Sequence, residues 1–185
     1  MTTILASKSP RRAKILSDIG WTFKVEPTES EEVSIPYAPK RTVLANAALK
    51  LNACRKNNPD AEIIAADTIV WFNGRIYGKP KDIDEARAFL RQLSGKTHSV
   101  FTGVAYCASG GGSLETCVTE SLVKFKDLSD EIIERYVASV NPVDRAGAYD
   151  IDECGDLIVE SYTGSYENIM GLPTEPLILM ANKKA

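Results

Sequence analysis

The sequence predicts an α/β fold built on a mixed, twisted sheet flanked by helices. Two observations support this prediction: segments with helical spacing alternate with strand-like segments, and some strands are joined by tight turns while others are joined by helices. A chain of 185 residues with 44% hydrophobic residues can bury a core of its own. We therefore expect residues 1–185 to form a single domain.

The chain begins with a short apolar strand at 4–6, and a helix follows whose start is marked by Ser9 and Pro10. Serine is a favoured N-cap residue, and proline suits the first helical turn. Gly20 closes this helix. The next patterns predict a strand at 21–25, an acidic loop at 26–39 and a long helix from about 39 to 57.

Residues 62–72 are β-branched and almost wholly apolar, which is typical of a central strand. Asn73-Gly74 predicts a two-residue hairpin turn after it. The segment 141–155 has no clear period and many polar residues, so it is a candidate functional loop. The remaining predicted elements are strands at 75–77, 97–107, 115–125 and 156–162 and helices at 82–93, 129–140 and 174–183.

Composition excludes several classes of protein. The net charge is -3 and the cationic residues form no long patch, which argues against a nucleic-acid partner. No apolar run approaches the roughly eighteen residues of a membrane helix, and no signal segment is evident, so we expect a cytoplasmic protein without a membrane partner. The four cysteines form no C-x-x-C pair, and we expect them to be reduced packing residues.

Two adjacent arginines, Arg11 and Arg12, fall on the first turn of the N-terminal helix. This end of a helix is already electropositive and suits an anion. With the hydroxyls of Ser7 and Ser9, two planar guanidinium groups would match a polyphosphate. The alternative is that both arginines are ordinary solvated side chains.

Asp67 lies inside the apolar strand at 62–72, where desolvation of a carboxylate must be offset by a partner. A metal ion or a lysine is the favoured partner, and backbone amides of a neighbouring loop are the alternative. At about 100° per residue, Lys50 lies only about 20° from Val43, within the apolar stripe of its helix. Lys50 therefore either points inward to an anion or extends its stem to the surface.

Further charged residues strengthen the pattern: Lys79 lies on a rigid Gly-Lys-Pro turn, and Glu31 and Glu32 lie in the acidic loop. Arginines, lysines and carboxylates without a Ser-His-Asp or Cys-His pair suit phosphate chemistry with a divalent ion. Hard oxygen ligands select Mg²⁺ or Mn²⁺. The P-loop and G-x-G-x-x-G motifs are absent from the sequence, and we assign no chemistry to the single histidine, His98.

Six motifs, in matching order, make the chain resemble the Maf proteins, nucleoside triphosphate pyrophosphatases also called septum formation inhibitors. These motifs are LASKSPRR, AADTIV, GKP, LSGKTHSVFTGV, DRAGAYDI and GSYENIMGLP. The resemblance runs nearly from end to end. It implies a fold similar to inosine triphosphate pyrophosphatase, with two lobes and a central cleft, and a homodimer.

The resemblance also implies hydrolysis of a nucleoside triphosphate to a monophosphate and pyrophosphate with Mg²⁺ or Mn²⁺, in nucleotide-pool sanitation with a link to division arrest. In this reading Asp67, Glu32, Lys50 and Lys79 are catalytic, and Asp67 and Glu32 hold the metal or the attacking water. The substrate-binding residues implied are Ser7, Ser9, Arg11, Arg12, Thr68 and Asp152.

The paired arginines of SPRR are similar to the branch of the family that acts on dTTP and UTP. Two positions depart from the family pattern. The family pattern has a lysine on this helix, and it can be aligned so that this position falls either on Ala48 or on Lys50. Ala48 lies about 140° around the helix from Val43, away from the apolar stripe, so we prefer the alignment on Lys50. The family's glutamine is replaced by Asp152, which only accepts hydrogen bonds and so affects base preference. The main rival function is a regulatory protein that binds triphosphates without hydrolysing them.

Overall fold

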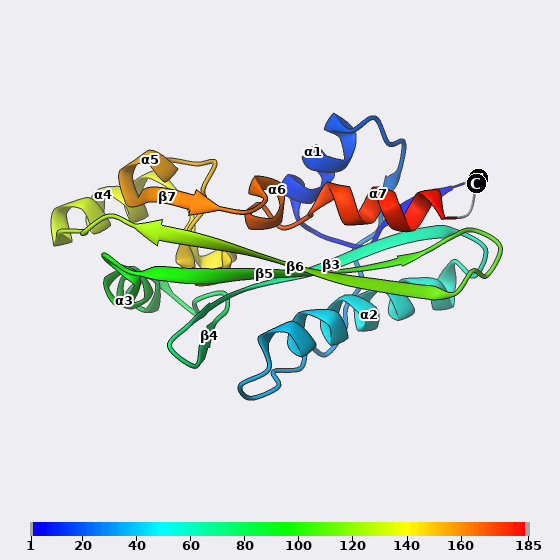
Figure 1. The fold of residues 1–185 in the computed structure, drawn as a ribbon, viewed down its shortest axis with the longest axis horizontal. Helices are drawn as coiled ribbons and strands as arrows, with labels where there is room; N and C mark the ends of the chain where they lie inside the picture. Colours follow the sequence, from blue (N-terminus) through cyan, green and yellow to red (C-terminus); the bar gives the residue numbers. More distant parts are fainter. Residues whose placement is uncertain (1, 184–185) are drawn as a thin grey trace. The chain divides into compact units, whose positions relative to one another are not determined.

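Seven strands form one mixed sheet in the computed structural model, which describes residues 2–183 (Figure 1). The strand order is β2-β1-β3-β5-β6-β7, and β4 pairs with β3. β1 is parallel to β2 and β3, whereas β3 is antiparallel to β4 and β6 to β7. The strands are β1 (Thr3–Leu5), β2 (Lys24–Val25), β3 (Glu62–Phe72), β4 (Arg75–Tyr77), β5 (Thr97–Cys107), β6 (Leu114–Phe125) and β7 (Val159–Thr163).

Helices connect and flank these strands, so the predicted α/β class with a mixed sheet is confirmed. Ser9 caps α1 and Pro10 opens it, as predicted. The helices are α1 (Pro10–Asp18), α2 (Pro39–Asn57), α3 (Ile83–Leu93), α4 (Asp130–Ser139), α5 (Gly155–Ile158), α6 (Tyr166–Ile169) and α7 (Thr174–Asn182), with 3₁₀ turns η1 (Pro142–Asp144) and η2 (Ala146–Ala148).

Two predicted strands begin later than the sequence indicates. The strand predicted at 21–25 covers only Lys24–Val25, because Trp21 still donates its backbone N–H to Leu16 at the end of α1. The strand predicted at 156–162 begins at Val159, because Cys154 adopts a left-handed conformation (φ 56°) that starts the short helix α5. In both places a local backbone turn overrides the β-propensity of the residues.

Contacts divide the described chain into two compact units. The first contains residues 2–68, 102–119 and 171–183, and the second contains residues 69–101 and 120–170. In the first unit, α2 packs its Ala47, Leu51 and Cys54 into a core with β1 and β3. Gly103 lets this helix approach β5 closely, because a Cβ atom there would lie 2.5 Å from the carbonyl oxygen of Val43. This close packing fixes the helix that carries Lys50.

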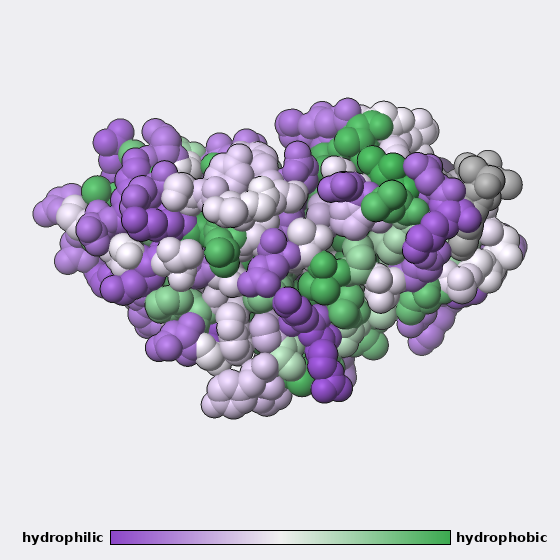
Figure 2. Space-filling model, viewed as in Figure 1, coloured by the Kyte–Doolittle hydropathy of each residue, from purple (hydrophilic) through white to green (hydrophobic). Residues whose placement is uncertain are grey.

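The surface of the first unit carries apolar side chains on α7. Ile178 and Leu179 are 36% and 59% exposed, and hydrophobic residues gather over α7 on the face shown in Figure 2. No helix among residues 2–183 combines the length and the apolar character needed to cross a bilayer.

The core of the second unit encloses the single histidine. Two amphipathic helices, α3 and α4, contribute Phe89, Leu90 and Ile133 to this core. His98 is buried, its Nε2 lies 2.9 Å from the Tyr149 hydroxyl, and its ring meets those of Phe125 and Tyr149 edge to face. Burial lowers the pKa of His98 to about 4. We infer a structural role for this residue.

The buried His98 should make stability depend on pH. Because its pKa is about 4 in the folded state and about 6.5 in the unfolded chain, its stabilising effect is complete above pH 6.5 and is lost as pH falls toward 4. Between pH 7 and pH 5 the free energy of unfolding should fall by about 2 kcal/mol through this residue. Urea unfolding of the wild type and of His98→Gln at both pH values measures the difference. An equal loss in both proteins would contradict the assignment.

Candidate active site

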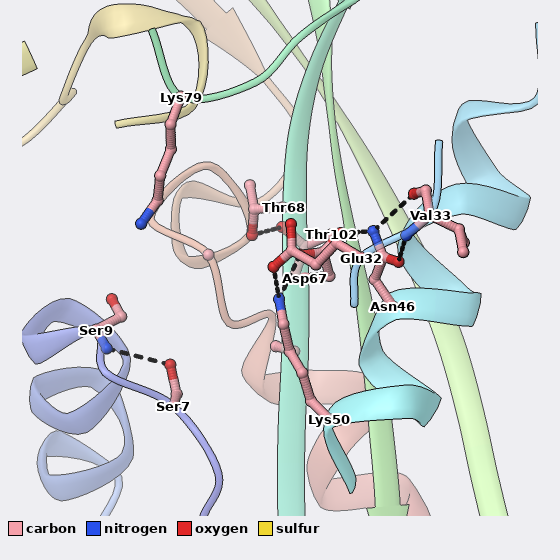
Figure 3. A network of polar contacts seen from close by, with 12 residues as sticks. Ser7, Ser9, Glu32, Val33, Asn46, Lys50, Asp67, Thr68, Lys79 and Thr102 are labelled. Carbon is pink, nitrogen blue, oxygen red and sulfur yellow. Dashed lines mark hydrogen bonds and ion pairs between the residues drawn. The ribbon is translucent and has the colours of Figure 1, made fainter. Parts of the chain in front are cut away.

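A buried carboxylate, an ammonium group and a second carboxylate meet in the first unit. Lys50 Nζ lies 2.6 Å from Asp67 Oδ1 and 2.8 Å from Glu32 Oε1 (Figure 3). The side chains of Asp67, Lys50 and Glu32 are 8%, 15% and 57% exposed. Lys50 therefore points inward to an anion and does not extend to the surface, and the partner of Asp67 is a lysine. We call these three residues the charge cluster.

Three different segments supply the charge cluster. Asp67 lies in the middle of β3, Lys50 on the inner face of α2 and Glu32 in the loop between β2 and α2. The neighbouring Glu31 is exposed. The inward position of Lys50 agrees with the helical angle calculated from Val43, so the Lys50 register is the one that reaches the carboxylates.

Asn46 is a polar contact of this cluster that the sequence reading missed. It is 3% exposed and donates from Nδ2 to Asp67 Oδ2 at 3.0 Å. The signal was available, because Asn46 lies one helical turn before Lys50 and thus within the same apolar stripe. A polar residue in such a stripe indicates a buried hydrogen-bond partner.

Arg12 is held by the protein itself. Its guanidinium donates to the carbonyl oxygens of Gly171 (2.8 Å) and Ala66 (2.9 Å) and to the hydroxyls of Ser7 (3.2 Å) and Thr68 (3.0 Å). Burial lowers the pKa of Arg12 to about 10, while the charge of Asp67 acts in the opposite direction. The group stays protonated at neutral pH, and these bonds connect α1 to β3 and to Gly171.

Four other residues predicted to bind the substrate contact Arg12 or adjoin it in the sequence. Ser7 Oγ also accepts from the backbone N–H of Ser9, and Ser9 Oγ caps α1 by accepting from Arg12 N. Thr68 Oγ1 lies 2.9 Å from Thr102 Oγ1. Arg11 is half-buried in the first turn of α1. Asp67 and Thr68 are adjacent on β3, so this strand links the arginine-bearing turn to the charge cluster.

Lys79 and Asp152 belong to the second unit. Lys79 Nζ forms an ion pair with Asp144 at 2.6 Å, and both side chains are 66% exposed. Asp152 accepts a hydrogen bond from the Tyr166 hydroxyl at 3.1 Å. Burial, followed by the charge of Asp152, raises the pKa of Tyr166 to about 12. One oxygen of Asp152 thus accepts from a tyrosine, a pairing that the sequence did not indicate.

The charge cluster has the donor chemistry of a partial magnesium site. Among residues 2–183, no group of three or more His, Cys, Asp or Glu side chains is placed to hold a metal ion. Mg²⁺, however, is commonly bound through one or two carboxylates and completes its shell with water and substrate phosphates. Asp67 and Glu32 direct oxygens at one cation, the Lys50 ammonium, and so fit this kind of site.

Comparison with known proteins agrees with the motifs. The family model described as "Maf-like protein" matches residues 2–184. A dTTP/UTP pyrophosphatase of Dictyoglomus turgidum is 44% identical over 182 residues, which cover 97% of this chain and 94% of that protein. A dTTP/UTP pyrophosphatase of Pyrococcus furiosus is 44% identical over 171 residues, covering 92% of this chain and 88% of that protein.

Structural comparison supports the fold independently of sequence. The structure of the Staphylococcus aureus Ham1 protein matches with a TM-score of 0.60 and 13% identity, and the match covers 100% of both chains. At this identity the likeness concerns the fold alone. The family model and the relatives extend over nearly the whole sequence, and the chain belongs to the Maf-like protein family.

Proposed function

We propose that this protein is a nucleoside triphosphate pyrophosphatase that hydrolyses the α–β phosphoanhydride of dTTP and UTP. Water and the triphosphate give a nucleoside monophosphate and pyrophosphate. The main support is the charge cluster, in which Lys50 bridges Asp67 and Glu32 inside a family whose similar members are named dTTP/UTP pyrophosphatases. Removal of these nucleotides from the pool would be the biological role.

Each residue of the cluster has a role in this proposal. A carboxylate of Asp67 or Glu32 orients the attacking water and accepts its proton as the water oxygen bonds to phosphorus. Lys50 neutralises the negative charge that develops on the phosphate oxygens, and Lys79 has the same role in the proposal. Arg11, Arg12 and Ser7 bind the phosphates at the α1 N-terminus, and Ser9 and Thr68, which hydrogen-bond to Arg12, belong to the same substrate-binding group.

A divalent ion is part of the proposal. Asp67 and Glu32 would hold Mg²⁺ or Mn²⁺, which would activate water and shield phosphate charge. We also propose a cytoplasmic homodimer that uses neither nucleic acid nor a membrane as partner, in keeping with the acidic net charge of -3.

The test is pyrophosphate release from a panel of nucleoside triphosphates, with and without EDTA. We expect release that EDTA abolishes. A protein that binds triphosphates but releases no pyrophosphate would instead be the regulatory alternative, and release that persists in EDTA would contradict the metal requirement.

The base preference is a separate prediction. We expect dTTP and UTP to be hydrolysed faster than ATP or GTP in one mixture, because the SPRR turn and the named relatives point to that branch. Competitive turnover, followed by chromatography, measures the order. Preference for a purine triphosphate would contradict the branch assignment, and preference for CTP would implicate the carboxylate of Asp152 in binding its amino group.

A further inference from the structure

The side-chain amide of Asn46 forms hydrogen bonds with two parts of the candidate active site. Its Oδ1 accepts from the backbone N–H of Val33 at 2.8 Å, and its Nδ2 donates to the carbonyl oxygen of Val33 at 3.1 Å. Nδ2 also donates to Asp67 Oδ2 at 3.0 Å. Figure 3 shows Asn46 between these partners. Val33 directly follows Glu32 in the sequence. The Asn46 amide therefore contacts the carboxylate of Asp67 and also holds the residue next to Glu32.

The chemistry of the partners fixes the orientation of this amide. The Val33 N–H can only donate, so it must face Oδ1. The Val33 carbonyl and the Asp67 carboxylate accept, so each takes one of the two N–H groups of Nδ2. All of these groups are used, and no other side chain of this size supplies one acceptor and two donors. At 3% exposure, the amide has little water to replace a lost partner.

Both oxygens of Asp67 are therefore assigned to different partners. Asn46 holds Oδ2, which leaves Oδ1 directed at the Lys50 ammonium. The same amide fixes Val33 as a strand neighbour would, and this brings Glu32 to the same ammonium at 2.8 Å. A mostly exposed glutamate in a loop without regular structure would otherwise sample many positions.

We propose that Asn46 is a positioning residue for catalysis: it sets the orientation of Asp67 and, through Val33, the position of Glu32. The inference rests on the proposed function. It predicts that loss of the Asn46 amide lowers the rate of the chemical step more than it weakens nucleotide binding, because the arginine-bearing turn does not contain Asn46.

The chain offers a matched control one helical turn earlier. Thr42 is 2% exposed. Its Oγ1 accepts a hydrogen bond from the backbone N–H of Ile35 at 3.0 Å and donates one to the carbonyl oxygen of Ala38 at 3.1 Å. Thr42 thus anchors the same loop from the same helix, but no hydrogen bond joins it to Asp67. Thr42→Val keeps the shape of the side chain and removes only this anchor.

The experiment compares kcat and KM for dTTP in the wild type, Asn46→Leu, Asn46→Asp and Thr42→Val, with melting temperatures from the same preparations. In both Asn46 variants kcat should fall at least about tenfold while KM changes less than about threefold. Asn46→Asp keeps the size and the acceptor but replaces the donor toward Asp67 with a like charge. Thr42→Val should lower the melting temperature yet keep kcat within about threefold of the wild type.

Amide hydrogen exchange of Val33 supplies a readout that does not depend on activity. Asn46→Leu should accelerate exchange at Val33, and Thr42→Val should not. This measurement tests the hydrogen bonds between Asn46 and Val33 even if the wild type hydrolyses no triphosphate. Absence of hydrolysis in the wild type would refute the proposed function but not these hydrogen bonds. A folded Asn46→Leu with wild-type kcat would overturn the inference. So would a Thr42→Val variant with an equal loss of kcat, or failure of both Asn46 variants to fold, which would make the residue purely structural.

Discussion

Asp67→Asn is expected to lower pyrophosphate release by about a hundredfold or more, the range associated with loss of a general base or a metal-binding carboxylate. The substitution keeps the shape and size of the side chain. It removes the negative charge with which Asp67 would bind a metal ion or accept a proton from the attacking water. Asparagine has a single acceptor oxygen, so either Lys50 or Asn46 loses its partner. Lys50 keeps Glu32 as a counter-ion, and the free energy of unfolding should fall by no more than about 3 kcal/mol.

Melting temperature and pyrophosphate release are measured on the same preparation at saturating Mg²⁺. Glu62→Gln is the matched control, because Glu62 lies on the same strand and accepts hydrogen bonds from the hydroxyls of Thr3 and Tyr106 at 2.5 and 2.6 Å. It should lose some stability and no activity. An Asp67→Asn variant that is destabilised but active would show that Asp67 serves the fold alone.

Local signals in the sequence predict most elements of this fold. Ser9 with Pro10 specifies the start of α1, and Asn73-Gly74 turns β3 into β4 with both residues at positive φ. The predictions fail where a backbone conformation outside any motif decides the outcome. The left-handed Cys154 is the example: a non-glycine residue rarely adopts this conformation, and the helix α5 that follows it includes Ile158, a β-branched residue that favours strands.

The site was predictable where helical geometry carries information. The position of Lys50 within an apolar stripe predicts an inward ammonium, and a carboxylate inside a buried strand predicts a cationic partner. The pairing of Lys50 with both Asp67 and Glu32 could not be predicted, because it depends on the course of the loop that carries Glu32. The sequence pattern does not specify that course. The bonds of Arg12 are a clearer case, since its carbonyl partners Ala66 and Gly171 are 54 and 159 residues away.

Lys50→Ala should lower turnover at least about tenfold, which corresponds to about 1.4 kcal/mol of transition-state stabilisation. The ammonium is the only cation bonded to Asp67 in the described part of the chain, at 2.6 Å, and it also pairs with Glu32. Without it, two carboxylates face one point with no counter-ion between them. We therefore expect Lys50→Ala to bind Mn²⁺ more tightly than the wild type in the absence of nucleotide, while its hydrolysis is slower.

Calorimetric titration with Mn²⁺ and pyrophosphate release, on the same protein, test both parts of this prediction. Lys56→Ala is the control, because Lys56 lies exposed in the last turn of the same helix and should change neither quantity. Since Lys50 already points inward, unchanged turnover could not be ascribed to a solvated lysine. It would mean that the ammonium only neutralises Asp67 in the folded protein, and the role in phosphate chemistry would have to be given up.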